Sequence, residues 1–151
     1  MEFQIMKQTK GMAIGVKLST TPMKLAKLTP KYLQEIKQKL TENKIDIIDA
    51  PVLIYYTMGY KIDVAIGYPV KEKYSLDEYE MFELESGSAL TSIHEGPYMK
   101  LRKTYKKMTK YMVENNLEAK YLAYEYYLNS PENVSKKELR TKVVLFIKED
   151  D

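Results

Sequence analysis

An acidic residue stands in the middle of an aromatic segment, Tyr121–Pro131, whose sequence is YLAYEYYLNSP. The composition of this segment predicts a β-strand, in which alternate side chains lie on opposite faces. Glu125 then shares one face with Tyr121, Ala123 and Tyr127. A carboxylate in mid-strand is costly if it is buried without a partner. This segment is therefore the first candidate for a functional site.

Two interpretations of Glu125 remain open at this point. Most acidic side chains are solvated, so the strand face could be exposed or the carboxylate paired locally. The alternative is a binding cleft, in which Glu125 awaits a cation and the tyrosines supply flat aromatic walls. The chain has 14 tyrosines and no tryptophan. A tyrosine ring is apolar with a polar tip, which suits a half-wet cleft as well as a strand.

The composition excludes several classes of site. The 151 residues are enough for one domain with a single core, and the net charge of +3 is too balanced to favour nucleic acid. Cysteine is absent, which rules out disulfides, thiolate catalysis and cysteine-based zinc sites. His94 is the single histidine, which excludes a multi-histidine metal site within one chain. No metal and no cofactor are expected. No apolar run reaches membrane-spanning length and no signal-peptide core is seen, which predicts a cytoplasmic protein away from the membrane.

The elements expected around this strand come in the same order twice. Apolar spacing and turn residues predict strands at Phe3–Leu18, Pro51–Tyr56, Lys61–Tyr68, Leu84–His94, a strand from Tyr121 and Leu139–Ile147. Two helices are expected, each with proline at its first position: Thr29-Pro30 to about Asn43, and Gly96-Pro97 to about Asn115. Ser19–Leu28 is expected to be a loop or a short helix. The sequence does not predict whether this segment closes over the groove as a lid. Glu149, Asp150 and Asp151 form an acidic tail expected to fray.

This order predicts an α+β fold made of duplicated β-α-β-β units related by a pseudo-twofold axis. The chain is expected to be a single domain over residues 1–151, with halves at about 1–70 and 82–148 joined by a polar linker, Pro69–Glu80. The Lys61–Tyr68 strand carries large side chains on one face and small ones on the other. We therefore expect an antiparallel sheet with the helices on its large-residue side and a ligand groove on the other.

Four motifs in this order resemble those of the GyrI-like family. These small-molecule-binding domains are also found as effector-binding domains of AraC- and MerR-type multidrug regulators. The segment from Ile93 to Tyr98 resembles the family's h-x-G-P-Y turn, and Glu125–Pro131 resembles its E-x-Y-L-x-x-P strand. The remaining matches are Thr141 with Val143, Leu145 and Ile147 for the last strand, and Pro51, Tyr55, Tyr56 and Asp63 for the first strand pair. Lys142 and Phe146-Ile147 depart from the usual ending.

The resemblance implies roles for individual residues. Glu125 corresponds to the buried acid that receives cationic aromatic ligands, with Tyr127, Tyr55 and Tyr56 in or near the same groove. Only one of the adjacent Tyr55 and Tyr56 side chains can face it. Tyr98 is expected to be a structural residue at the helix start, and His94 is also interpreted as structural.

Three functions follow as hypotheses. The first is a stand-alone protein that senses or sequesters lipophilic aromatic or cationic compounds, since no DNA-binding module is expected before the first strand. The second is a hydrolase of strained electrophiles with Glu125 as general base, against which the lack of tryptophan counts. The third is a gyrase-inhibitor-like protein-interaction module, using the basic face of the second helix and the acidic stretch Asp77 to Glu85. The natural ligand and the oligomeric state are not predicted.

Overall fold

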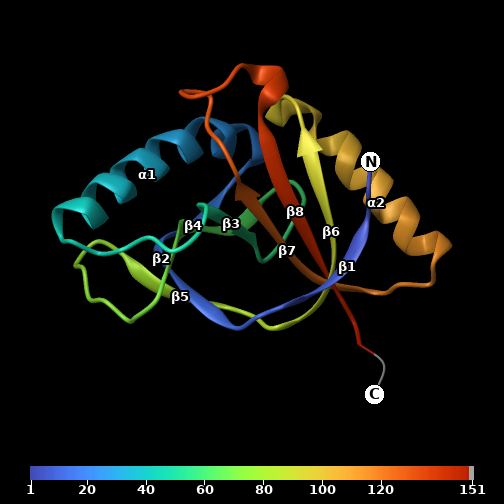
Figure 1. Ribbon diagram of the computed structural model, residues 1–151, viewed down its shortest axis with the longest axis horizontal. Coiled ribbons are helices and arrows are strands. Elements are labelled where there is room, and N and C mark those ends of the chain that lie inside the picture. The colour runs from blue at the N-terminus through green and yellow to red at the C-terminus, as the bar shows by residue number, and fades with distance from the viewer. Residues whose placement is uncertain (150–151) are drawn as a thin grey trace. The chain divides into compact units, whose positions relative to one another are not determined.

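The computed structural model describes residues 1–149 and divides into two compact units (Figure 1). One unit combines Met1–Gln8 with the chain from Gly87 onward, and the other comprises Thr9–Ser86. We describe the two units separately. Asp150 and Asp151, two of the three residues of the predicted acidic tail, lie outside the described residues.

The unit Thr9–Ser86 is one antiparallel sheet with one helix. Its elements are β2 (Gly11–Thr20), α1 (Pro22–Glu42), β3 (Val52–Tyr55), β4 (Ile62–Val70) and β5 (Glu80–Leu84). The strands pair in the order β3–β4–β2–β5. The Tyr68 hydroxyl in β4 donates to the Leu33 carbonyl of α1 over 3.1 Å. The large-residue face of β4 therefore carries the helix, as the sequence predicted.

The opposite, small-residue face lets two backbones approach closely. Gly15 in β2 lies directly across from Gly67 in β4. A Cβ atom on Gly15 would lie 1.8 Å from the Ile66 carbonyl oxygen, closer than any real contact. This pair therefore requires glycine at Gly15, which explains the small side chains seen in the sequence.

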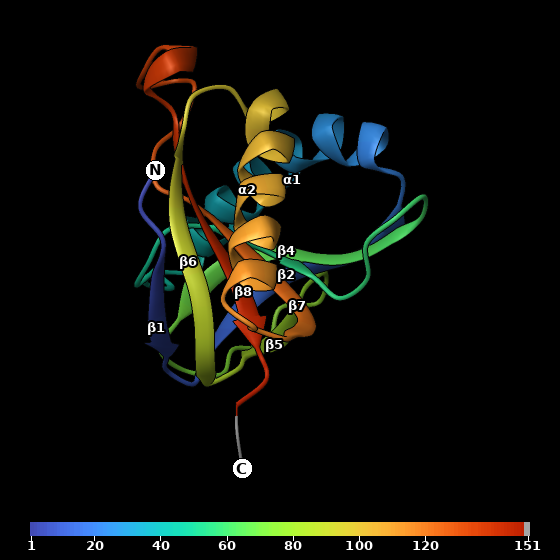
Figure 2. The same cartoon turned by 90° about the vertical axis from the view of Figure 1, so that its right-hand side faces the viewer.

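The second unit has the same plan. Its elements are β1 (Gln4–Gln8), β6 (Gly87–Glu95), the 3₁₀ turn η1 (Tyr98–Lys100), α2 (Leu101–Glu114), β7 (Ala119–Tyr127), the 3₁₀ turn η2 (Lys136–Glu138) and β8 (Arg140–Ile147). The antiparallel order is β1–β6–β8–β7. Figure 2 shows α2 lying along one face of these strands. Between helix and sheet lies a core of Leu90, Leu101, Met108, Met112, Val143 and Ile147.

The duplication predicted from the sequence is confirmed. Both β2-α1-β3-β4 and β6-α2-β7-β8 follow the β-α-β-β order, and corresponding strands take corresponding places in the strand order of the two units. The fold is therefore α+β, with antiparallel strands and, in each unit, a helix on one face of the strands.

Each unit also contains a strand that is distant in sequence, so the units are not the contiguous halves 1–70 and 82–148. The segment Phe3–Leu18 is two strands, not one, and the first of them, β1, pairs with β6. Part of the predicted linker and the start of the next strand form β5, which pairs with β2. An alternating pattern shows that a segment is a strand, but it does not identify the partner.

The start of α1 differs from the prediction. The helix begins at Pro22, where the Thr21 hydroxyl accepts from the Lys24 amide over 3.4 Å, and Pro30 lies in its interior. The Thr29 hydroxyl instead donates back to the Leu25 carbonyl over 2.8 Å. The segment Ser19–Leu28 is thus the end of β2 followed by the first part of α1, in which Leu25 is buried in the core. Its end at Asn43 agrees with the prediction.

The tyrosine-rich strand is irregular at its beginning. Tyr121 adopts a left-handed conformation with φ of 57°, and the pairing of β7 with β8 shifts between Ala119 and Ala123. The Tyr121 side chain is exposed, so the predicted shared face holds for Glu125 and Tyr127 but not for Tyr121.

Among residues 1–149, no helix is long and apolar enough to cross a membrane.

Candidate functional site

Glu125 lies in β7 on the face of the sheet that α2 covers. Its partner across the strand pair is Val143, which belongs to the core beneath α2. Opposite residues in antiparallel strands point to the same side of a sheet. The Glu125 side chain is accordingly only 3% exposed. The prediction that this carboxylate lies on an exposed strand face is therefore wrong, whereas local pairing of the carboxylate agrees with its hydrogen bonds. The carboxylate also lies on the helix-bearing face of its own sheet and not on the face away from the helix, where the ligand groove was expected.

Two tyrosine hydroxyls donate to the buried carboxylate. The Tyr127 hydroxyl, two residues along β7, donates to Oε1 over 2.9 Å, and the Tyr105 hydroxyl of α2 donates to Oε2. Hydrogen bonds to an ionised acceptor are shorter and stronger than neutral ones. The two phenols therefore stabilise the negative charge of Glu125 away from bulk water.

Tyr105 is a site residue that the sequence analysis missed. It was placed in the apolar stripe of the second helix, and its ring does pack against the core beneath α2. The signal that could have found it is the hydroxyl, since a half-buried tyrosine needs a partner for its polar tip. The partner, Glu125, lies 20 residues further along the chain.

A third tyrosine extends the aromatic surface beside Glu125. The ring of Tyr98, in η1, meets the ring of Tyr127 edge to face, with centroids 5.4 Å apart. Burial raises the pKa of Tyr98, so its hydroxyl stays neutral at physiological pH. Aromatic faces attract cations, and neutral phenols keep that property. Tyr98 thus lies next to the site, although the sequence suggested only a structural role.

His94 joins β6 to the beginning of α2. Its Nε2 lies 3.0 Å from the Pro97 carbonyl oxygen and its Nδ1 lies 2.6 Å from Thr104 Oγ1. Because a carbonyl oxygen only accepts, Nε2 carries a proton. Both ring nitrogens are engaged, which gives the buried histidine a structural function.

Thr141 is the unusual polar residue of this face. It lies in β8 between His94 of β6 and Tyr127 of β7, and its side chain is fully buried. Its hydroxyl oxygen has no hydrogen-bond partner among the described residues. Leaving a buried hydroxyl unsatisfied typically costs about 1–3 kcal/mol.

Tyr55 and Tyr56 belong to the other unit, Thr9–Ser86, where they point to opposite faces. Tyr55 lies across from Val64, on the face that carries α1. Tyr56 follows β3, and Lys17 on the small-residue face places its ammonium 5.3 Å from the ring centre. Burial and the nearby Glu80 and Glu85 raise the pKa of Tyr56. That either tyrosine shares a groove with Glu125 stays a prediction.

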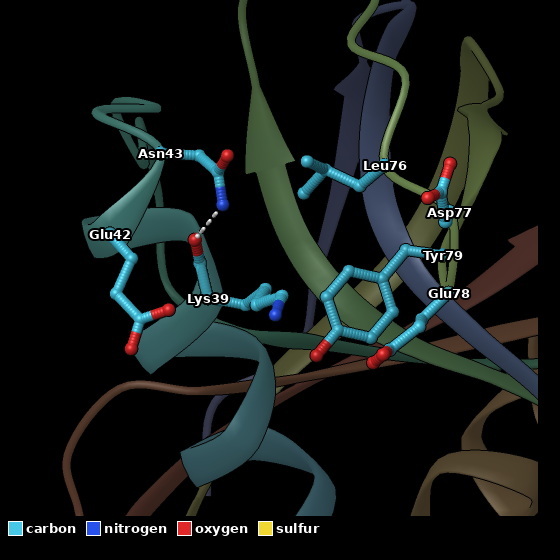
Figure 3. A pocket seen from close by; sticks show the side chains of 7 residues that line it. All are labelled: Lys39, Glu42, Asn43, Leu76, Asp77, Glu78 and Tyr79. Atoms are coloured by element: carbon cyan, nitrogen blue, oxygen red, sulfur yellow. Dashed lines mark hydrogen bonds between the residues drawn. The ribbon is translucent and has the colours of Figure 1, made fainter.

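A surface hollow of about 470 Å³ lies elsewhere in the unit Thr9–Ser86 (Figure 3). It is formed by the end of α1 and the connection before β5, and is lined by Lys39, Glu42, Asn43, Leu76, Asp77, Glu78 and Tyr79. Its carboxylates are exposed to solvent. Within residues 1–149 no cluster of histidine and acidic side chains is arranged to hold a metal ion. The hollow therefore differs from the surroundings of Glu125, whose carboxylate is buried.

The sequence and the fold were compared with those of known proteins. The chain matches the GyrI-like small molecule binding domain over residues 1–148, whereas no curated protein sequence matches it. The EcmrR C-terminal domain superimposes with a TM-score of 0.83 at 17% identity, covering 99% of this chain and 98% of that domain.

Two further solved structures share the fold. EcmrR in complex with DNA gives a TM-score of 0.85 at 16% identity and 99% coverage of this chain, which spans only 58% of the EcmrR chain. SAV2435 bound to tetraphenylphosphonium gives 0.71 at 13% identity, covering 98% of this chain and 94% of SAV2435.

Proposed function

Because the chain belongs to the GyrI-like family of small-molecule-binding domains, we propose that it binds lipophilic aromatic cations, with Glu125 as the anionic centre of the site. The observation that carries this proposal is a carboxylate only 3% exposed whose two oxygens accept from the hydroxyls of Tyr105 and Tyr127. Such a protein would sense or sequester its ligands.

The physical basis is the low dielectric around Glu125. A charge that two phenols already stabilise attracts a cation more strongly there than at the protein surface. The rings of Tyr98 and Tyr127 add cation–π attraction of about 0.5–2 kcal/mol for each good contact. A lipophilic cation loses less hydration than a small ion when it is buried, so it is the favoured ligand. Tetraphenylphosphonium, bound by the related SAV2435, has this chemistry.

Binding requires a side chain to move. With Glu125 almost fully buried, a ligand reaches the carboxylate only if Tyr105, Tyr127 or Tyr98 rotates aside. Rotation of a tyrosine hydroxyl away from Glu125 leaves room for the ligand charge to replace its hydrogen bond. We therefore assign Tyr127 and Tyr105 to the first contacts of the ligand.

Tyr55 and Tyr56 are the other ligand-binding residues that the family resemblance implies, and their surroundings differ. Tyr55 is favoured over Tyr56, because its side chain lies on the face of its strand that carries α1. Tyr56 lies on the opposite face near Lys17, where a cationic ligand would meet a like charge.

The two alternatives have less support. A general base must take a proton from water, but the hydrogen bonds from two phenols stabilise the Glu125 anion and so weaken it as a base. For the protein-interaction hypothesis, the relevant charges are the exposed basic residues of α2 together with Lys100 just before it, namely Lys100, Arg102, Lys103, Lys106, Lys107 and Lys110. Substitution of these residues would weaken partner binding and leave ligand binding intact.

The test is calorimetric titration with tetraphenylphosphonium. We expect the wild-type protein to bind and Glu125→Gln to bind at least tenfold more weakly, a loss of about 1.4 kcal/mol. Glu132→Gln, at an exposed position, is the matched control and should bind like wild type. Equal affinity of wild type and Glu125→Gln would remove Glu125 from its assigned role.

A further inference from the structure

We propose that Thr141 is a second polar contact of the binding site, so that the preferred ligands carry a hydrogen-bonding group in addition to their positive charge. The inference rests on the proposed function and narrows its ligand class. It concerns aromatic cations bearing a hydroxyl or amine, as opposed to purely hydrocarbon ones such as tetraphenylphosphonium.

The first observation is the unpartnered hydroxyl of Thr141. The side chain is fully buried, and its oxygen has no hydrogen-bond partner among residues 1–149. Valine has nearly the same shape and is equally suited to a strand, and it would avoid the cost of burying a hydroxyl. A threonine at this position is therefore best explained by a partner that is not part of the chain.

The second observation is that the polar neighbours of Thr141 are committed elsewhere. Both ring nitrogens of His94 are engaged, by Thr104 and by the Pro97 carbonyl. The Tyr127 hydroxyl donates to Glu125. Neither set of hydrogen bonds includes Thr141, whose hydroxyl oxygen has no partner among the described residues.

The third observation is the position of Thr141 relative to Glu125. Thr141 lies directly across from Tyr127, and Glu125 lies directly across from Val143, two residues further along β8. Thr141 and Glu125 are thus diagonal neighbours on one face, a relation that places Cβ atoms roughly 7 Å apart. Both are nearly inaccessible. Tyr127 is next to both, so its movement changes the surroundings of both residues.

The positions of Glu125 and Thr141 predict which chemical groups the ligand carries. A positive charge bound at Glu125 and a hydroxyl or amine one aromatic ring away would satisfy both side chains at once. A purely hydrocarbon cation would neutralise Glu125 but would leave Thr141 unsatisfied. The difference in affinity between two such ligands is the signature of a Thr141 contact.

The experiment compares two probes on three proteins. The probes are tetraphenylphosphonium and (4-hydroxyphenyl)triphenylphosphonium, which differ by one hydroxyl, and the proteins are wild type, Thr141→Val and Thr141→Ser. We expect wild type and Thr141→Ser to bind the hydroxylated probe about tenfold more tightly than the plain one. In Thr141→Val the ratio should fall below twofold, with tetraphenylphosphonium affinity within twofold of wild type. The empty Thr141→Val protein should unfold at the wild-type temperature or above.

Several results would overturn the inference. These are a wild type with no preference between the probes, or a Thr141→Val protein that retains the preference. A Thr141→Val protein that loses thermal stability while its probe ratio is unchanged would show that the hydroxyl holds a structural water instead. Failure of both probes to bind wild type would overturn the proposed function and this inference together, whereas binding without a Thr141-dependent ratio overturns the inference alone.

Discussion

At the scale of single residues, the site is a carboxylate stabilised from two directions. Strand alternation alone placed Glu125 and Tyr127 on one face, and the structure has them joined by a hydrogen bond. The role of Tyr105 could not be predicted from the sequence. Helical spacing shows which face of a helix is apolar, but it does not show which strand residue the tyrosine hydroxyl contacts. The prediction that Tyr121 shares this face is wrong for a local reason, because its left-handed backbone conformation interrupts the alternation of the strand.

The hydroxyl of Tyr105 can be tested by its removal. Because a hydrogen bond to a buried charge is lost, Tyr105→Phe should lower the free energy of unfolding at neutral pH by about 1–2 kcal/mol. In a Glu125→Gln background the same substitution should cost clearly less, since the charge is gone. Urea denaturation of the four proteins gives the coupling between the two residues.

The matched control for this cycle is Tyr121→Phe. Its ring is 85% exposed, so loss of its hydroxyl should change the free energy of unfolding by less than about 0.5 kcal/mol. Identical costs of Tyr105→Phe with and without Glu125 would contradict the assigned hydrogen bond.

At the scale of elements, the sequence predicted the strands and helix ends better than the helix starts. Thr21-Pro22 and Thr29-Pro30 both have the residue types of a helix start, a capping threonine followed by proline. The structure begins the helix at the first pair, because an earlier start buries Leu25 against the sheet. The N-cap and proline preferences favour both pairs equally as helix starts, and only tertiary packing distinguishes them.

This difference predicts the effect of replacing Pro30. A proline in a helix interior costs about 3 kcal/mol relative to alanine, less about 0.4–1 kcal/mol because proline also restricts the unfolded chain. Pro30→Ala should therefore raise the free energy of unfolding, by about 1–3 kcal/mol, as measured by urea denaturation. Pro22→Ala, at the first helical position, should be nearly neutral. A Pro30→Ala protein no more stable than wild type would argue that the helix begins at Thr29-Pro30 after all.

At the scale of the whole molecule, the duplicated plan was predictable and the strand exchange was not. Element order and two expected proline-initiated helices indicated the repeat. The expected start of the second helix at Pro97 is wrong, because Pro97 precedes the 3₁₀ turn η1 and α2 begins at Leu101. The pairing of β1 with β6 depends on contacts nearly 90 residues apart, such as the Ser92 hydroxyl donating to the Glu2 carbonyl over 2.9 Å. The predicted fraying of the acidic tail also fails for Glu149, whose carboxylate accepts from the Ser88 hydroxyl over 2.6 Å.

The Glu149 contacts predict a pH dependence. The Ser88 hydroxyl and, after it, the Lys7 ammonium lower the pKa of Glu149 in the folded protein. A lowered folded-state pKa contributes stability above the ordinary carboxyl value, roughly pH 4, and that stability is lost as pH falls through the lowered value. The melting temperature of Glu149→Gln should therefore lie slightly below that of wild type at pH 7, and the difference should shrink as pH falls below the ordinary carboxyl value. A difference that persists in acid would show that the Glu149 charge is not its cause.

The measurement that tests the central claim most directly varies the charge of the ligand and of residue 125 together. Wild type and Glu125→Gln would each be titrated with tetraphenylphosphonium and with triphenylphosphine oxide, an uncharged compound with the same aromatic groups. If Glu125 binds the cation through its charge, the substitution should weaken tetraphenylphosphonium at least tenfold and the neutral compound by less than about threefold, a difference of roughly 0.7 kcal/mol or more. Equal losses for both compounds would mean that Glu125 shapes the site without recognising the charge, and the account of a cation-binding centre would be wrong.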